Sequence, residues 1–302
     1  MKRFEGIFTV MLTACDEGGG IDRAAQTELT RYLVDSGVHG LVALGSNGEC
    51  PYLTPDLQRE LLDIVVTECG GAVPVIAGIN ERGTEPAVEA ARYAEAAGAD
   101  GLLVALHAFY SLEEDSVFRH YERVCGAVGI PVLYYNYPAA TNLTLAPAAI
   151  ARLAEIDNLV GAKETIFNVG EVEELVKATG EEFCVLSGMT FNLVPTMAVG
   201  ACGAICPLPN IIPEKAVLLY EAIVAGDSER ALAAQNELFA FVPLLATSPT
   251  PHAMLKHALG LLGHPIRNDV KGPLPQLTDA QAKAVEDNLR RNGLIQGVAG
   301  GR

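Results

Sequence analysis

Eight short apolar runs recur along this chain, and each is followed by a longer segment with helical periodicity. Apolar runs bounded by glycine or proline are typical of strands in a parallel sheet that is covered on both faces. Eight strand–helix units are the number that closes a (β/α)8 barrel. We therefore predict a (β/α)8 TIM barrel, with an open, doubly wound sheet as the alternative. The predicted strands span residues 6–12, 40–44, 74–78, 101–105, 131–135, 159–163, 183–187 and 203–206.

Helical periodicity is clear between several strands and continues after the last one. A barrel needs only one helix after its eighth strand. We therefore predict a barrel over residues 1–226 and a small C-terminal helical extension over 227–302, which is not independent because no linker separates it. The tail GVAGGR, 297–302, is expected to be disordered. The predicted helices include 22–36, 55–69, 84–97 and 115–128 in the barrel, then 213–225, 228–241, 251–262 and 279–292.

Composition excludes several classes of function. Half of the 302 residues are apolar, which supplies a large core, and the formal net charge is −16. Such a surface repels nucleic acid and anionic membranes, so neither is an expected partner. The N-terminal MKRFEGIFTV lacks the apolar length and cleavage site of a signal peptide, and no run of about 18 uncharged apolar residues occurs. A cytoplasmic protein is expected.

Seven scattered cysteines include no CxxC pair, which indicates reduced thiols in an intracellular protein. Cys202 and Cys206 are close in sequence, but a zinc site needs two further clustered ligands. We expect both to be core residues and predict no metal.

Lys163 ends a predicted strand in the segment NLVGAKETIF, 158–167. Barrels carry their reactive groups at the carboxyl ends of strands, and Tyr135 occupies that place on the preceding strand, so the two side chains are expected to converge. Apolar surroundings favour a neutral amine, which can attack a ketone to form a Schiff base. The alternative is a lysine that extends to solvent or pairs with Glu164.

A glycine-rich turn, GSNGE at 45–49, follows the second predicted strand. Gly45 and Gly48 allow the backbone to turn tightly, which leaves the N–H groups around Ser46 and Asn47 free to bind a carboxylate. Alone, this pattern is most often a simple turn. In combination with Tyr135 and Lys163 it predicts three parts of one site.

These motifs resemble those of the superfamily of dihydrodipicolinate synthase and N-acetylneuraminate lyase, the class I pyruvate-type aldolases. The similarity covers nearly the whole chain through GSNGE at 45–49, YNYP at 135–138, VGAKE at 160–164, and SGMT at 187–190 followed by GAIC at 203–206. The resemblance implies no metal or other cofactor. It also implies a homotetramer built as a dimer of dimers.

The resemblance implies roles for individual residues. Lys163 would form the Schiff base with C2 of a small 2-oxo acid, Tyr135 would relay protons, and Ser46 would link Tyr135 to solvent. The backbones of Ser46 and Asn47 would hold the substrate carboxylate. The remaining implied contacts, which flank the lysine, are Gly188 and Ile205.

Two differences between this sequence and the synthases of the superfamily bear on the identity of the substrate. In the synthases of this superfamily an arginine two residues after the YNxP proline binds the aldehyde's carboxylate, but here Ala139 and Ala140 follow Pro138. The synthases also donate a tyrosine across a tight dimer interface. Phe109 and Tyr110 are both candidates for that place, and the sequence leaves the choice open.

Lyases for sugar acids in the superfamily bind substrate hydroxyls with polar residues around the lysine. Thr165, Thr190 and His107 fit that pattern, with a helix cap or a structural histidine as the alternatives. GSNGE, with asparagine at its third position, resembles the 4-hydroxy-2-oxoglutarate and 2-keto-3-deoxy sugar acid branches. The sequence thus predicts a Schiff-base lyase, aldolase or dehydratase for such an acid. The alternatives are a dihydrodipicolinate synthase and a non-catalytic relative.

Overall fold

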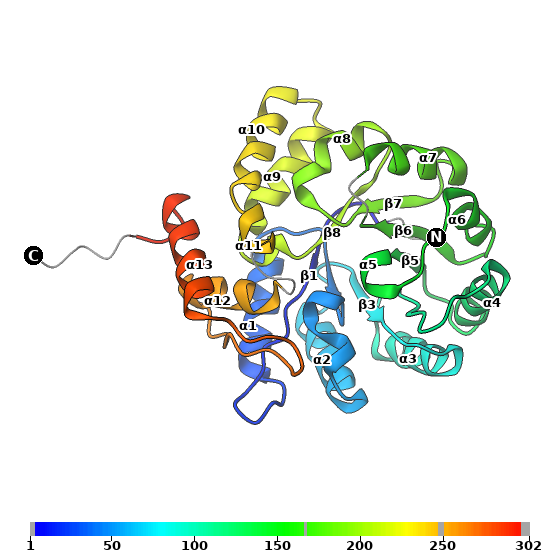
Figure 1. Ribbon diagram of the computed structural model, residues 1–302, viewed down its shortest axis with the longest axis horizontal. Helices are drawn as coiled ribbons and strands as arrows, with labels where there is room; N and C mark the ends of the chain where they lie inside the picture. The colour runs from blue at the N-terminus through cyan, green and yellow to red at the C-terminus, as the bar shows by residue number, and fades with distance from the viewer. Residues whose placement is uncertain (1–3, 166–167, 247–250, 297–302) are drawn as a thin grey trace, which may run out of the picture.

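Eight parallel strands form a closed barrel in the computed structural model, which describes residues 4–165, 168–246 and 251–296 of the protein. Each strand pairs with the next along the chain, and β8 pairs with β1, where Phe8 lies opposite Ile205. Figure 1 shows the barrel inside a ring of helices. The predicted (β/α)8 barrel is confirmed and the open sheet is excluded. The strands are β1 (Gly6–Val10), β2 (Gly40–Ala43), β3 (Val75–Ile79), β4 (Gly101–Val104), β5 (Val132–Asn136), β6 (Leu159–Glu164), β7 (Cys184–Ser187) and β8 (Gly203–Cys206).

The barrel helices begin and end at local sequence signals. In α2 (Pro55–Cys69) the Thr54 side chain accepts a hydrogen bond from Leu57 N, and Gly70 ends the helix at a φ of 55°. The predicted range 55–69 is confirmed. The predicted helix 115–128 is wrong at its end, because α4 (Glu114–Cys125) stops at a cap formed by Gly126. The others are α1 (Arg23–Asp35), α3 (Thr84–Ala97), α5 (Pro138–Thr141), α6 (Pro147–Leu153), α7 (Val169–Thr179), α8 (Leu193–Ala198) and α9 (Pro213–Val224).

Two apolar layers hold the barrel together. One fills its interior with strand side chains such as Phe8, Leu133 and Leu186, and the ring of Tyr135 belongs to this layer. The other lies between the strands and the surrounding helices. Because both faces of each strand are covered, the strands have continuous apolar sequences.

The cysteines belong to these layers. All seven are buried and none forms a disulfide. Cys202 and Cys206 are core residues, and burial raises the pKa of the Cys206 thiol to about 12. Within the described residues, no group of three or more histidine, cysteine or acidic side chains is arranged to hold a metal ion.

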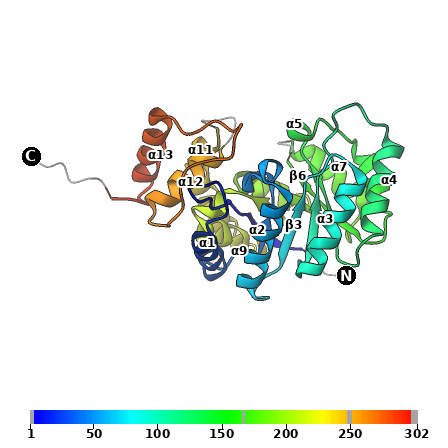
Figure 2. The same cartoon turned by 90° about the horizontal axis from the view of Figure 1, so that it is seen from below.

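Within the described residues, four helices follow the barrel and form the C-terminal extension. Figures 1 and 2 show α12 and α13 on one side of the barrel, beside α1. The predicted helix 228–241 is wrong at its end: α10 stops at Phe239, and α11 begins at Val242 with Pro243 in its first turn, a position that tolerates proline. The boundary at residue 227 stays a prediction, and the tail 297–302 lies outside the described residues. The helices are α10 (Ser228–Phe239), α11 (Val242–Ala246), α12 (His252–Leu261) and α13 (Asp279–Arg291).

Candidate active site

Lys163 and Tyr135 meet at the carboxyl ends of β6 and β5, as predicted. The two residues are Cα partners in the parallel pairing of these strands, so their side chains leave the sheet on the same face. Lys163 Nζ donates a hydrogen bond of 2.9 Å to the Tyr135 hydroxyl and lies 4.1 Å from the centre of the tyrosine ring. Both residues are buried, with exposed fractions of 2% and 4%. The amine therefore lies in the barrel interior with a phenol as its partner.

The ends of these two strands are fixed by a second polar pair on the opposite face. Asn136 Nδ2 donates to Glu164 Oε2 at 2.6 Å, and both side chains are buried. Successive residues of a strand point to opposite faces, so the Glu164 carboxylate points away from Lys163. The hydrogen bonds of the two side chains go to different partners, from Asn136 to Glu164 and from Lys163 to Tyr135. The contact between Asn136 and Glu164 was not predicted from the sequence, although each residue directly follows a predicted site residue.

Ser46 extends the polar contacts toward solvent. Its hydroxyl lies 3.1 Å from the Tyr135 hydroxyl, and Ser46 is half-buried. Tyr137 stacks on Tyr135, with ring centres 5.8 Å apart and planes inclined by 21°. Ser46, Tyr135 and Lys163 thus form a continuous line of polar groups from the barrel mouth to the buried amine.

The predicted glycine-rich turn is present and is tight. Residues Ser46–Gly48 form one turn of 3-10 helix after β2. A Cβ atom on Gly45 would lie 2.4 Å from a methyl carbon of Val10, so only glycine fits there. Within the described part of the chain, the backbone N–H groups of Ser46 and Asn47 donate no hydrogen bond. They are therefore available to a ligand, as an anion-binding turn requires.

Two of the predicted substrate contacts bond to the protein itself, Thr165 through its hydroxyl and Thr190 through its backbone carbonyl. The Thr165 hydroxyl donates to the backbone carbonyl of Asn136, close to the end of β5. Thr190 is buried, and its carbonyl accepts a hydrogen bond from Gln235 of α10. Gly188 lies so close to Thr165 that a Cβ atom would be 2.4 Å from its methyl carbon. Contact of these residues with a substrate stays a prediction.

Three further candidates, His107, Phe109 and Tyr110, lie on the loop after β4 and differ in how exposed they are. His107 is half-buried, and burial lowers its pKa, with a contribution from Arg82. Phe109 and Tyr110 are exposed to 79% and 76%, and their rings meet edge to face at 5.0 Å. Both lie on the surface of the single chain, so the question of which one reaches a neighbouring subunit stays open. Ile205 is buried in the interior layer with Tyr135.

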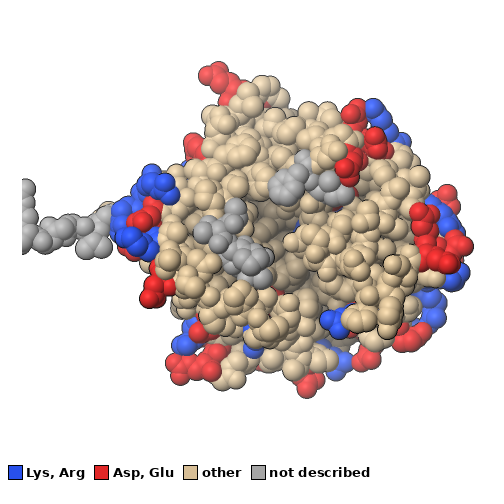
Figure 3. Space-filling model, viewed as in Figure 1, with Lys and Arg blue, Asp and Glu red and all other residues tan. Residues whose placement is uncertain are grey.

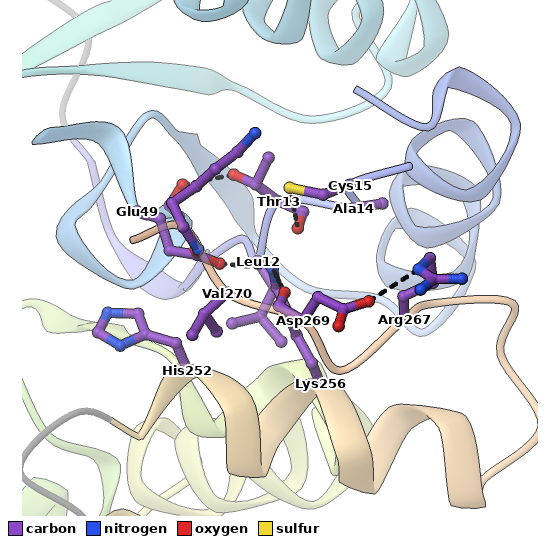
Figure 4. A network of polar contacts seen from close by, with 12 residues as sticks. Leu12, Thr13, Ala14, Cys15, Glu49, His252, Lys256, Arg267, Asp269 and Val270 are labelled. Atoms are coloured by element: carbon purple, nitrogen blue, oxygen red, sulfur yellow. Dashed lines mark hydrogen bonds and ion pairs between the residues drawn. The ribbon is translucent and has the colours of Figure 1, made fainter. Parts of the chain in front are cut away.

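The C-terminal helix α12 also contacts the site, which the sequence analysis did not anticipate. His252 Nε2 lies 3.0 Å from the Ser46 carbonyl oxygen, and Lys256 forms an ion pair with Glu49 of the glycine-rich turn. Figure 4 shows both side chains reaching from α12 toward the turn. The available signal was a lysine in a helical run that is otherwise apolar except for His257, MLKHALGLL at 254–262.

Charge is distributed unevenly around this end of the molecule. In Figure 3, which has the same viewpoint as Figure 1, lysine, arginine and acidic side chains lie mainly around the edge of the face. The polar cluster at the ends of β2, β5 and β6 lies at the centre of the barrel end. The fold and this cluster define a (β/α)8-barrel protein with its candidate site at the carboxyl ends of the strands.

The chain belongs to the dihydrodipicolinate synthetase family, whose sequence model matches residues 3–292. It is 34% identical to a 4-hydroxy-tetrahydrodipicolinate synthase of Methylobacterium radiotolerans, with 97% of each chain covered. It is 37% identical to an uncharacterized DapA-like lyase of Halobacterium salinarum, covering 96% of this chain and 94% of the other.

Solved structures agree with this assignment. YagE, a prophage protein of the dihydrodipicolinic acid synthase family from E. coli K12, crystallised in complex with pyruvate, superposes with a TM-score of 0.93 at 29% identity, covering 97% of this chain and 99% of that one. Dihydrodipicolinate synthase from Aquifex aeolicus gives a TM-score of 0.92, also at 29% identity, covering 96% and 99%. The predicted family resemblance is confirmed.

Proposed function

We propose that the protein is a class I lyase that forms a Schiff base between Lys163 and a small 2-oxo acid. The observation that carries the proposal is the Lys163 amine, buried at 2% exposure and 2.9 Å from the Tyr135 hydroxyl. A buried lysine is costly unless it is paired or used, and a phenol brings no formal counter-charge. Family membership supports the same chemistry, because a relative of the family was crystallised with pyruvate.

The proposed chemistry uses the residues at the ends of β2, β5 and β6. The neutral Lys163 amine attacks C2 of the 2-oxo acid, and loss of water gives an imine. The protonated imine accepts the electron pair when a bond at C3 breaks, so an enamine forms. Tyr135 transfers protons to and from the reacting oxygen, and Ser46 passes them to solvent. The N–H groups of Ser46 and Asn47 bind the substrate carboxylate.

The proposed substrate is a 2-keto-3-deoxy sugar acid or 4-hydroxy-2-oxoglutarate, cleaved or dehydrated through the enamine. Ala139 and Ala140 are exposed on α5 at the place where the synthases, by the family resemblance, have an arginine. An arginine–carboxylate contact is bidentate and charge-assisted, and alanine replaces none of it. Thr165, Thr190 and His107 are the proposed contacts to the distal end of the substrate.

Synthesis of dihydrodipicolinate is the second candidate, because relatives at 34% identity carry the name 4-hydroxy-tetrahydrodipicolinate synthase. The missing arginine argues against it, and the intact lysine and tyrosine argue against a non-catalytic relative. The first candidate predicts negligible condensation of pyruvate with aspartate semialdehyde. It also predicts that at least one acid in a panel of 2-oxo-3-deoxy and 4-hydroxy-2-oxo acids releases pyruvate or loses water. Semialdehyde turnover that matches the best acid would reverse this ranking.

A homotetramer built from dimers is part of the proposal. Phe109 and Tyr110 form an exposed aromatic pair on the loop after β4, and a second copy of the chain would cover it. Sedimentation of the purified protein tests the assembly directly. Seven buried cysteines, none of which forms a disulfide, support a cytoplasmic location. Within the described residues, no helix is long and apolar enough to cross a membrane.

A further inference from the structure

The C-terminal extension holds the glycine-rich turn through a charge that is completely buried. Glu49 ends the turn in the left-handed region, with φ of 61°, a conformation that favours glycine. Its carboxylate is fully buried, at 2.5 Å from Lys256 Nζ and 2.6 Å from the backbone N of Lys271. Lys256 is equally buried and donates a second bond of 2.8 Å to the carbonyl of Asp269. Figure 4 shows this network between α12 and the turn.

A buried ion pair is a poor choice if stability alone is required. An apolar pair of similar volume is often at least as stable, because desolvation offsets most of the attraction. What an ion pair with fixed partners provides is a single geometry. The backbone conformation of Glu49 would suit glycine better. The presence of glutamate at this position is therefore explained by its side chain and not by its backbone.

A second contact from α12 fixes the peptide plane inside the turn. The carbonyl oxygen of Ser46 is 3.0 Å from His252 Nε2, which must therefore donate, over a separation of 206 residues in sequence. In a trans peptide the C=O and N–H groups point in opposite directions. Because the Ser46 carbonyl shares its plane with the N–H of Asn47, His252 fixes the direction of that N–H.

Thr13 completes the set of contacts from the barrel side. Its hydroxyl donates to the carbonyl of Gly48 at 2.5 Å. The carbonyl groups of Ser46 and Gly48 and the side chain of Glu49 are thus held by residues outside the turn. Among the described residues, the N–H groups of Ser46 and Asn47 have no partner, and these are the groups assigned to the substrate carboxylate.

We propose that His252 and Lys256 are positioning residues for substrate binding, so that the C-terminal extension is a working part of the active site. They act through the turn: His252 orients the Asn47 N–H, and Lys256 holds Glu49 and with it the end of the turn. The inference rests on the proposed function, because it assigns the turn to a carboxylate. It concerns affinity for the 2-oxo acid, and leaves the reactivity of Lys163 to Tyr135.

The test measures how fast borohydride traps the pyruvate adduct as the pyruvate concentration rises. His252→Phe should raise the half-saturating concentration about tenfold, because misplaced binding groups are costly, while the maximal trapping rate changes little. His252→Gln keeps a donor and should recover most of the affinity. His257→Phe is the matched control, since His257 lies on the same helix and has Glu286 of α13 as its charged neighbour. A loss of active protein alone would lower the amplitude and leave half-saturation unchanged.

A double variant separates positioning from stability. Lys256→Met leaves Glu49 buried without its counter-ion and should lower the melting temperature strongly. Glu49→Gln combined with Lys256→Met removes both charges, so stability should return while the raised half-saturating concentration persists.

Adduct trapping on the native protein separates failure of the proposed function from failure of the positioning inference. If it forms no reducible adduct, the proposed function fails. If it does, and folded His252→Phe and double variants both bind pyruvate normally, only the positioning inference is overturned. Should both variants fail to fold, a pyruvate complex of the native protein decides, and a carboxylate bound away from the N–H groups of Ser46 and Asn47 overturns the inference.

Discussion

Two lysines are buried near the same barrel mouth, and they differ in their partners. Lys256 lies between α12 and the glycine-rich turn, with a carboxylate at 2.5 Å and a carbonyl at 2.8 Å. Lys163 lies at the end of β6, with the neutral hydroxyl of Tyr135 at 2.9 Å. Burial is nearly equal, at 0% and 2%. Burial is therefore nearly the same for the lysine that we propose to be reactive and for the one that we propose to be structural, and the two differ in their partners.

The different partners of Lys163 and Lys256 suggest different tasks for the strand ends and for the contact between α12 and the glycine-rich turn. A lysine with a formal counter-ion and a second acceptor is held as an ammonium group that fixes geometry. A lysine whose partner is a phenol has a group with which it can exchange a proton. The predictions below follow from this difference.

The largest expected effect comes from the partner of Lys163. Tyr135→Phe removes the hydroxyl that contacts both Lys163 and Ser46, and turnover should fall by about 10²–10⁴-fold, the usual contribution of a general acid–base group. Substrate binding should be largely kept. Steady-state kinetics on the best substrate of the panel measures both. Near-normal turnover would show that another group, such as Tyr110, carries the proton.

For the free energy of unfolding, the larger effect should come from Lys256 and not from Lys163. Lys256→Met should lower the free energy of unfolding by about 3–5 kcal/mol, because it leaves a buried carboxylate without its partner. Lys163→Met should cost much less, since the group left behind is a neutral phenol. Urea unfolding of both variants gives the comparison. Equal losses of unfolding free energy in the two variants would contradict the claim that only Lys256 has a structural counter-ion.

The smallest expected effect concerns pH and the region of Lys256. Burial lowers the pKa of His252 below 6.5, an effect that Lys256 reinforces, while Glu49 and the Ser46 carbonyl oppose it. The unfolded chain therefore takes up a proton below pH 6.5 that the folded protein binds less readily, so stability is present above that pH and is lost as pH falls. His252→Gln should make the loss shallower when unfolding is measured at pH 7.5 and 5.5. An identical pH dependence in the variant would contradict this assignment.

Much of the fold was predictable because its signals are local. Helix α2 is confirmed over 55–69, since Thr54, Pro55 and Gly70 mark its two ends. Strand β8 is confirmed at 203–206. The convergence of Lys163 and Tyr135 was predictable too, because adjacent parallel strands of a barrel bring their carboxyl ends together.

The remainder depended on contacts that no local pattern contains. The partner of Glu49 lies in a helix beyond the barrel, and the pairing of Ser46 with His252 spans 206 residues. The engagement of the Thr165 hydroxyl by Asn136 follows from the close approach of two strand ends. For Phe109 and Tyr110 the choice depends on the proposed contact with a second copy of the chain, which no pattern within one chain describes.

The most direct test of the account is to locate the adduct formed when the native protein is incubated with pyruvate and reduced with borohydride. Peptide mass mapping should find one reduced pyruvate adduct per chain, on Lys163, with Lys256 unmodified. Lys163→Ala should form none, whereas a folded protein that lacks Lys256 should still react at Lys163. An adduct on Lys256, or one that persists in Lys163→Ala, would contradict the claim that a buried lysine's partner determines its reactivity.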